Sequence, residues 1–343
     1  MSYPVSRRAF LKASITAGAA VALAPQSLGQ EAGAPAAERQ ANVAGPKGTY
    51  ALEEIRRMRG GSQSHLMRCS DGHYYVVKFR NNPQHRRVLV NEMLATRLAA
   101  TLGLLTAPMS PIYVSERLIE LTPDLTMEMG RSRIPCEPGM QFGSRYLGEP
   151  NRPSVHPFVP RGEWDLVENR ADFVGMFVFD KWTCNTDWRQ VLFQRCKSDS
   201  PMKVGRCAAV MIDQGLCFNC GEWNFPDSPI RGFYHDRNVY KGILGLDSFE
   251  PWLGRLESEI NLDVLVEATR GIPAGWYDFD AVALQALLQR LDRRRTAVRR
   301  MLLEAVQKSG LVFPNWRSCP RPSPVSVESA AILTKTHGIF RLT

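Results

Sequence analysis

One lysine inside an apolar stretch constrains this chain more than any other feature. Residues 74–79 are mostly aromatic or β-branched and predict a buried β-strand, yet this strand contains Lys78. An unpaired ammonium group is very costly to bury, so Lys78 needs an anionic partner. Glu92, preceded by Asn91, stands at the start of the next amphipathic segment. We therefore expect a strand lysine paired with a helix glutamate.

Composition bounds the class of protein. The chain has 343 residues, of which 44% are hydrophobic and 22% charged, so it is globular and long enough for two lobes. Its formal net charge of +9 suits either phosphate-bearing ligands or an ordinary basic surface, and composition leaves both open. The arginine run at residues 293–295 has no interleaved aromatic residues and predicts a solvated helix face, so no nucleic-acid partner is expected.

The N-terminus has the pattern of a targeting signal. Arg7 and Arg8 form a twin-arginine signature, and the apolar run at residues 13–24 is too short to span a bilayer. We predict a twin-arginine signal peptide at 1–30 and a flexible linker at 31–48. Export to the periplasm or another extracytoplasmic space follows if the signal is real, and a cytoplasmic location if it is not. No transmembrane segment is expected beyond the signal region.

The cysteines give a weak signal. Cys217 and Cys220 form a single CxxC without a second CxxC or a histidine pair, which favours two small residues after a strand over a zinc or redox site. Disulfides stay open if the chain is exported.

Periodicity predicts strands in the first half and mostly helices in the second. We expect a hairpin of strands at 66–69 and 74–79, a helix at 88–104, and strands at 108–113 and around Ile119. Residues 50–59 fit a helix or a strand. Further on we expect helices at 171–182 and 279–307 and two strands at 190–195 and 208–212. The boundaries are an N-lobe at 49–145, a C-lobe at 146–310 and a tail at 311–343.

Two aspartates follow in suitable places. Asp187 lies in a loop between a helix and a strand, where a carboxylate can orient a substrate hydroxyl. Asp213 ends an apolar strand two residues before Gly215, where a carboxylate can hold Mg²⁺ against phosphate oxygens. Each residue alone has an ordinary explanation: Lys78 as a snorkelling edge lysine, Glu92 as a first-turn helix acid, and either aspartate as a turn residue. Together, in this order, they indicate a phosphate-binding cleft.

The segments that carry these residues resemble the HipA-like kinase family, and more narrowly its short bacterial members without a separate N-terminal subdomain. The similar segments, which fall within residues 49–310, are 61–65, 76–84, 90–92, 142–145, 185–190 and 212–215.

The resemblance implies an α+β, bilobal protein-kinase-like fold, with a small β-rich N-lobe, a larger mostly helical C-lobe, and ATP and Mg²⁺ between them. Lys78, tied to Glu92, would contact the α- and β-phosphates, Asp187 would act on the acceptor hydroxyl, and Asp213 would bind Mg²⁺. Ser62, Gln63 and Ser64 would offer backbone N–H groups and hydroxyls to the phosphates. Gln141, Phe142, Gly143 and Ser144 would be the hinge that binds the adenine.

Two positions depart from the family pattern. Gln190 stands where an asparagine would be the second metal ligand, and Gln214 replaces the aromatic residue of the Asp-Phe-Gly motif. Three functions stay open. The chain is an active kinase that transfers the ATP γ-phosphate to a Ser/Thr or small-molecule hydroxyl, a pseudokinase that binds a nucleotide or a protein, or an exported structural or redox protein.

Overall fold

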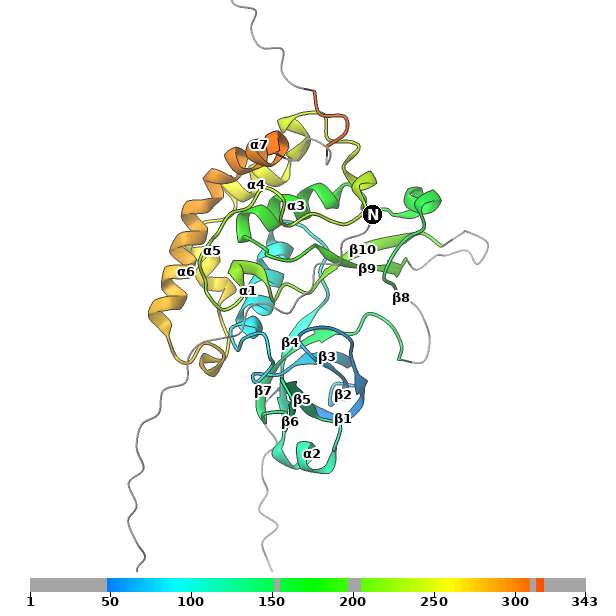
Figure 1. The fold of residues 1–343 in the computed structure, drawn as a ribbon, viewed down its shortest axis with the longest axis vertical. Coiled ribbons are helices and arrows are strands. Elements are labelled where there is room, and N and C mark those ends of the chain that lie inside the picture. Colours follow the sequence, from blue (N-terminus) through cyan, green and yellow to red (C-terminus); the bar gives the residue numbers. More distant parts are fainter. Residues whose placement is uncertain (1–47, 151–154, 197–204, 309–312, 318–343) are drawn as a thin grey trace, which may run out of the picture. The chain divides into compact units, whose positions relative to one another are not determined.

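A closed five-stranded β-barrel forms the first part of the fold (Figure 1). The strand order around it is β1-β2-β3-β7-β4, with antiparallel pairs throughout except for the parallel pair β1 and β4. Residues 50–59, which fitted a helix or a strand, lie mainly in β1. The bounds are β1 Thr49–Arg57, β2 His65–Cys69, β3 Tyr74–Lys78, β4 Met109–Val114 and β7 Gly139–Arg145.

A short helix and a hairpin lie between β4 and β7 in the sequence. They are α2 Glu116–Leu121 and the paired strands β5 Thr126–Met129 and β6 Ser132–Pro135. The strand expected around Ile119 is wrong. The Ser115 hydroxyl accepts a hydrogen bond from the Leu118 amide at 3.1 Å and starts a helix there instead.

Helix α1 Val88–Thr101 is buried on almost every side, as expected for a helix packed between other elements. It contacts β4 and β7 of the barrel as well as α3 and α5. The remaining helices share one large hydrophobic core with α1. They are α3 Asp172–Thr183, α4 Trp252–Ser258, α5 Leu262–Ala268, α6 Ala281–Arg294 and α7 Val298–Lys308, with short 3₁₀ turns η1 Arg161–Leu166, η2 Cys217–Asn219, η3 Arg237–Tyr240, η4 Leu246–Phe249, η5 Ala274–Trp276 and η6 Arg295–Ala297.

A second, three-stranded sheet positions the two aspartates. It contains β8 Val155–His156, β9 Gln190–Arg195 and β10 Cys207–Ile212, all antiparallel. The first residue of β9, Gln190, pairs with the last residue of β10, Ile212. The loop that precedes β9 and the loop that follows β10 therefore leave the same end of this sheet, and these loops carry Asp187 and Asp213.

The computed structural model describes residues 48–150, 155–196, 205–308 and 313–317. The predicted signal peptide and linker lie outside these residues, as does most of the predicted tail. The described residues belong to one compact unit with two hydrophobic clusters, one inside the barrel and one among the helices. The packing divides this unit no further, so the two lobes stay a prediction. Within the described ranges, no helix is long and apolar enough to cross a membrane.

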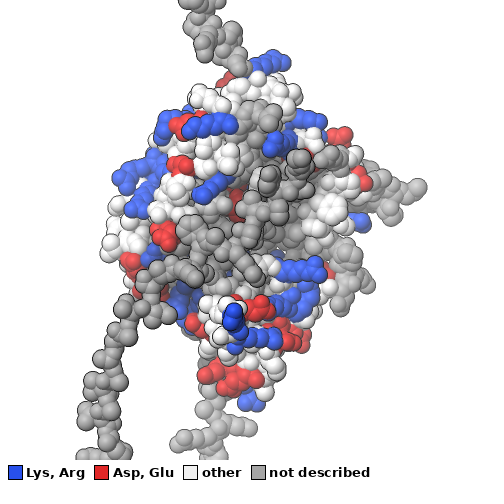
Figure 2. All heavy atoms as spheres, in the orientation of Figure 1, with Lys and Arg blue, Asp and Glu red and all other residues white. Residues whose placement is uncertain are grey.

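The surface carries both signs of charge. Figure 2 shows Lys and Arg side chains interspersed with Asp and Glu on the displayed face. Exposed ion pairs elsewhere in the structure include Arg300 with Glu304 at 2.8 Å and Arg170 with Asp165 at 3.0 Å. The displayed face therefore shows a mixture of both charges rather than a single basic patch.

Candidate functional site

The ammonium group of Lys78 lies between two carboxylates. Lys78 ends β3, is 6% exposed, and donates to Glu92 Oε1 and, at 2.6 Å, to Asp213 Oδ1. Glu92 is 2% exposed on α1, and Asp213 follows β10 directly. Segments far apart in the sequence thus meet at one charged group, and the pair expected between Lys78 and Glu92 is formed.

Glu92 also fixes the backbone that follows Asp213. Its Oε2 accepts from the Gln214 amide at 3.0 Å and its Oε1 from the Gly215 amide at 2.9 Å. Glycine is required at 215, because a Cβ there would lie 2.7 Å from Val88 Cγ1 and 3.0 Å from Glu92 Oε1. This contact gives Gly215 a steric role that its place in a turn did not reveal.

The electrostatics of this cluster favour a second cation. Burial is outweighed by the two carboxylates, so the pKa of Lys78 is raised. At Asp213 burial is outweighed by the Lys78 ammonium, so the pKa of Asp213 is lowered. At Glu92 burial prevails, and the pKa of Glu92 is raised. Since 35% of the Asp213 side chain is exposed and the carboxylates outnumber the ammonium, these residues fit a divalent ion beside Asp213.

Other ligands would have to complete such a metal site. Among the described ranges, no group of three or more His, Cys, Asp or Glu side chains is arranged to hold a metal. Mg²⁺ is commonly bound by one or two carboxylates together with substrate phosphates and water, so Asp213 alone suits that mode of binding.

Asp187 lies on a loop that starts at a left-handed residue. Cys184, with φ +51°, ends α3, and the buried Asn185 side chain accepts from the Asp187 amide at 3.1 Å. The Asp187 carboxylate accepts from the Trp188 amide at 2.8 Å and from Gln190 Nε2 at 3.3 Å. Asp187 is half-buried and Gln190 exposed, so both side chains are accessible to a substrate or an ion.

A buried ion pair joins the Asp187 loop to the Asp213 loop. Arg189 binds Asp180 of α3 through two nitrogens and donates to the Ile212 carbonyl at 3.1 Å and to Gln214 Oε1 at 2.5 Å. Arg189 and Asp180 are each 2% exposed. Sequence reasoning gave Asp180 no role, although an acid inside the apolar stretch 171–182 is the same signal that singled out Lys78.

Asn91 is a second residue whose role the sequence did not disclose. It is fully buried on α1, and its Nδ2 lies within hydrogen-bond distance of the carbonyls of Gly215 at 2.9 Å, Cys217 at 3.0 Å and Cys220 at 2.6 Å. Its Oδ1 accepts from Trp223 Nε1 at 2.8 Å. The turn that it holds is strained: Phe218, Asn219 and Cys220 all have φ near +58°.

Lys181 holds the segment that follows this turn. Its ammonium donates to the carbonyls of Ser228 at 2.9 Å, Pro229 at 2.9 Å and Arg231 at 2.7 Å, which uses all three of its donors. It also lies over the ring of Phe177, 5.0 Å from the centroid. Burial lowers the pKa of Lys181 to about 8; the charged or titratable groups around it are Asp180, Asp227, Cys184 and Arg231.

In the predicted phosphate loop, residues 62–64, the structure leaves the two serines available to a ligand but not the Gln63 side chain. Ser62 and Ser64 are buried, and within the described part of the chain their hydroxyls make no hydrogen bond, so they can still serve a ligand. The Gln63 side chain, in contrast, is bound to Arg57 and to both backbone groups of Glu128. The side-chain amide of Gln63 is therefore occupied, and its backbone N–H group, which was expected to serve the phosphates, donates to the Gly60 carbonyl at 3.2 Å.

The hinge expected at Gln141, Phe142, Gly143 and Ser144 is also corrected. These residues lie within β7, whose backbone pairs with β3 on one side and β4 on the other. The Gln141 side chain accepts from the Arg80 amide at 2.8 Å and donates to the Glu137 carbonyl at 2.7 Å, and Phe142 packs edge-on against Trp276. A strand paired on both edges has no backbone groups to offer to adenine.

The cysteines among the described residues contribute no side chain to this cluster. Cys217 is fully buried, and burial raises its pKa, so its thiol is not activated. Cys69, Cys136, Cys184, Cys196, Cys207 and Cys220 are likewise free thiols.

Comparison with known proteins shows that part of the chain is similar to a family of kinases. Residues 52–220, a little under half of the chain, match the family model described as HipA-like kinase. The matched region includes Lys78, Glu92, Asp187 and Asp213. It confirms the resemblance over these residues, while the narrower placement among short bacterial members stays a prediction. No curated protein matches the sequence.

Distant likeness to solved kinase structures exists as well. The Golgi casein kinase is 14% identical with a TM-score of 0.43, covering 76% of this chain and 75% of that one. A structure of the same kinase with Mn/ADP bound is 15% identical with a TM-score of 0.43 and the same coverage of 76% and 75%. The Helicobacter pylori proinflammatory kinase CtkA is 14% identical with a TM-score of 0.43, covering 76% of this chain and 96% of that one.

The Asn91 network predicts a large effect of a nearly isosteric change. Asn91→Asp replaces the buried donor with a carboxylate that faces carbonyl oxygens, so we expect the free energy of unfolding to fall by about 3 kcal/mol. Asn81→Asp is the matched control, because Asn81 also donates to a carbonyl, that of Pro135 at 2.9 Å, but is only half-buried. Urea titrations of both variants measure the difference, and equal losses would contradict the assigned role of Asn91.

Lys181 predicts a specific pH dependence. Its pKa of about 8 in the folded chain lies below the ordinary value of 10.5, so between these values the unfolded chain binds more protons. The burial penalty is present below pH 8 and is relieved as the pH rises, which adds about 3 kcal/mol to the stability of the wild type relative to Lys181→Met. Urea titrations of both proteins from pH 7 to 10.5 test this, with the exposed Lys241→Met as control. A flat or falling difference would refute it.

Proposed function

We propose that this protein is a phosphotransferase that uses Mg-ATP and transfers the γ-phosphate to a hydroxyl group of a Ser/Thr residue or a small molecule. The observation that carries the proposal is the buried ammonium of Lys78 between Glu92 and the partly exposed Asp213. This arrangement supplies a fixed cation for phosphate oxygens and a carboxylate for a metal ion. The match to the HipA-like kinase family over residues 52–220 supports it.

In this proposal Lys78 stays tied to Glu92 and turns toward the α- and β-phosphates when nucleotide enters. Asp213, whose side chain is 35% exposed, would hold Mg²⁺, and the ion would neutralise phosphate charge. The free hydroxyls of Ser62 and Ser64, with the backbone N–H groups around them, serve the phosphates.

Asp187 orients the acceptor hydroxyl and takes its proton. Its half-buried carboxylate is held in place by the Trp188 amide rather than by a cation. Gln190 borders both Asp187 and the end of β10, where we propose that it serves as the second metal ligand.

We propose that adenine contacts residues 146–148, which follow β7, instead of residues 141–144. Strand β7 ends at Arg145, and Tyr146, Leu147 and Gly148 are only half-buried, although the Tyr146 amide still donates to the Tyr74 carbonyl at 2.8 Å. The Leu147 carbonyl already accepts from Gln194 Nε2 at 3.1 Å, which ties this stretch to β9.

The alternative is a pseudokinase that binds nucleotide or protein without turnover. Gln190 favours it, because a longer carboxamide that contacts Asp187 replaces the usual asparagine. The proposed twin-arginine export also favours it, since ATP is scarce outside the cytoplasm, although that route carries folded proteins and a bound nucleotide would travel with them.

Turnover separates the two functions. We expect ADP release from Mg-ATP in the presence of a mixture of Ser/Thr peptides. Asp187→Asn should lower it by about 10²-fold or more with ATP affinity nearly unchanged, because only proton transfer and orientation are lost. Asp165→Asn, with a side chain 93% exposed, is the control and should behave as the wild type.

Two other outcomes would contradict this proposal. An Asp187→Asn variant that turns over as fast as the wild type would remove the assigned role of Asp187. Wild-type protein that binds Mg-ATP but releases no ADP would support the pseudokinase.

A further inference from the structure

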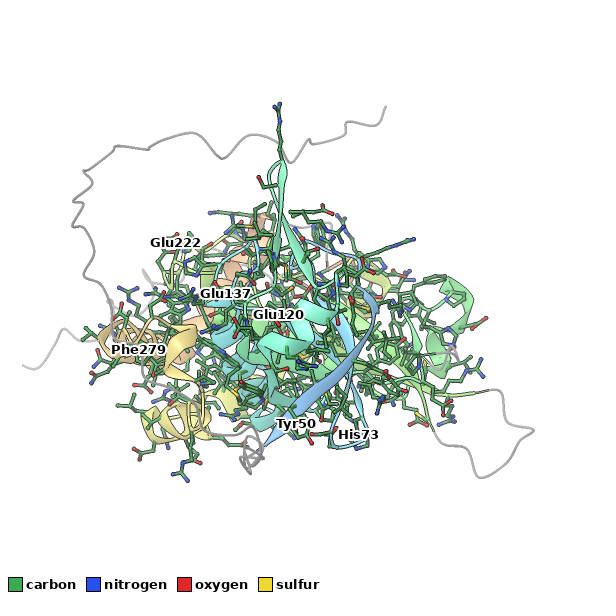
Figure 3. The ribbon with its side chains drawn as sticks, turned by 90° about the horizontal axis from the view of Figure 1, so that it is seen from below. Tyr50, His73, Glu120, Glu137, Glu222 and Phe279 are labelled. Atoms are coloured by element: carbon green, nitrogen blue, oxygen red, sulfur yellow. The ribbon has the colours of Figure 1, made fainter. Side chains whose placement is uncertain are left out.

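The Gln63 side chain leaves the predicted phosphate loop and binds a neighbouring hairpin. Its Oε1 accepts from the Glu128 amide at 2.7 Å, and its Nε2 donates to the Glu128 carbonyl at 2.9 Å. Figure 3 shows the hairpin of β5 and β6 projecting beyond α2, the helix that carries the labelled Glu120. Gln63 and Glu128 are 65 residues apart in the sequence, so this is a tertiary contact.

The reason for this contact is the free edge of β5. Among the described strands, β5 pairs only with β6, so its other edge presents N–H and C=O groups that no strand pairs. The primary amide of Gln63 offers one acceptor and one donor in the geometry of a peptide group. It therefore pairs with Glu128 as one further residue of a strand would.

Arg57 closes the arrangement from β1. Its Nη2 donates to Gln63 Oε1, and its Nη1 binds Glu128 Oε1 at 2.9 Å. The loop itself has few other ties. The backbone N–H of Gln63 donates to the Gly60 carbonyl at 3.2 Å, and the backbone N–H of Met58 donates to the Ser64 carbonyl at 2.8 Å. These two bonds close the turn at its base.

The backbone at Gln63 adapts to this anchor. Gln63 has φ +48°, in the left-handed region that costs a non-glycine residue energy, and Gly60 has φ +131°. A glutamine in that conformation persists because its side chain is bound at a fixed place.

We propose that Gln63 is a positioning residue, which clamps the phosphate loop to the edge of β5 so that the hairpin sets the affinity for the phosphates of the nucleotide. This rests on the proposed function, and it replaces a direct contact of Gln63 with phosphate. Ser62 and Ser64, on either side of Gln63, are thereby held in place without using their own hydroxyls.

Gln63→Asn is the sharpest variant. Asparagine tolerates the left-handed backbone and keeps the amide, but it is one methylene too short to reach Glu128. We expect faster amide hydrogen exchange at 60–64 and a dissociation constant for Mg-ATP, by calorimetry, that rises about tenfold, since a loop residue must then be ordered on binding. The affinity for adenosine, which has no phosphates, should stay within about twofold of the wild type. Arg131→Ala, an exposed charge loss at the tip of the same hairpin, is the control.

The outcomes separate the clamp from the function. Unchanged exchange at 60–64 in Gln63→Asn would overturn the clamp. Faster exchange with equal effects on ATP and adenosine, or with no effect on either, would overturn its role toward phosphate. Wild-type protein that binds no Mg-ATP would overturn the proposed function and the role toward phosphate with it, while the exchange rates would still decide the clamp.

Discussion

The structure depends on how one buried ammonium group is compensated. Lys78 ends a barrel strand, where it is 6% exposed, and a lone charge there would be strongly destabilising. Two carboxylates from other parts of the chain resolve this, Glu92 from α1 and Asp213 from the loop after β10. The same need for compensation thus joins the barrel, the first helix and the second sheet at one point, and it leaves an excess of negative charge that suits a metal ion.

Buried polar side chains fix the loops around this point. Asp180 and Arg189 tie the Asp187 loop to the end of β10, and Asn91 holds a turn whose backbone lies in the left-handed region. Lys181 holds the segment after that turn through three carbonyls. Buried donors and acceptors must find partners, so each of these side chains specifies one loop conformation. A loop that would otherwise be mobile can then present its aspartate in a fixed position.

The sequence predicts the parts of this arrangement that follow from local pattern. The hairpin of β2 and β3, the helix after Val88, and strands β9 and β10 all appear where hydrophobic periodicity places them. The pairing of Lys78 with Glu92 was accessible because a charged residue in an apolar strand demands a partner. The strand expected around Ile119 was wrong because a serine cap started a helix there.

The parts that sequence reasoning missed depend on contacts between distant segments. Gln63 looks like any polar loop residue until β5 is known to have a free edge, and Gln141 looks accessible until β7 is known to be paired on both sides. Asn91 carries no local mark of burial at all.

The central claim is that Lys78 and Asp213 form a nucleotide site. The thermal unfolding midpoint of the full chain at millimolar ATP, with and without Mg²⁺, tests it most directly, because a ligand that binds only the folded state raises the midpoint. The account predicts a Mg-dependent rise of about 5 °C in the wild type and none in Lys78→Met or Asp213→Asn. No rise in the wild type, or an equal rise in all three proteins, would contradict it.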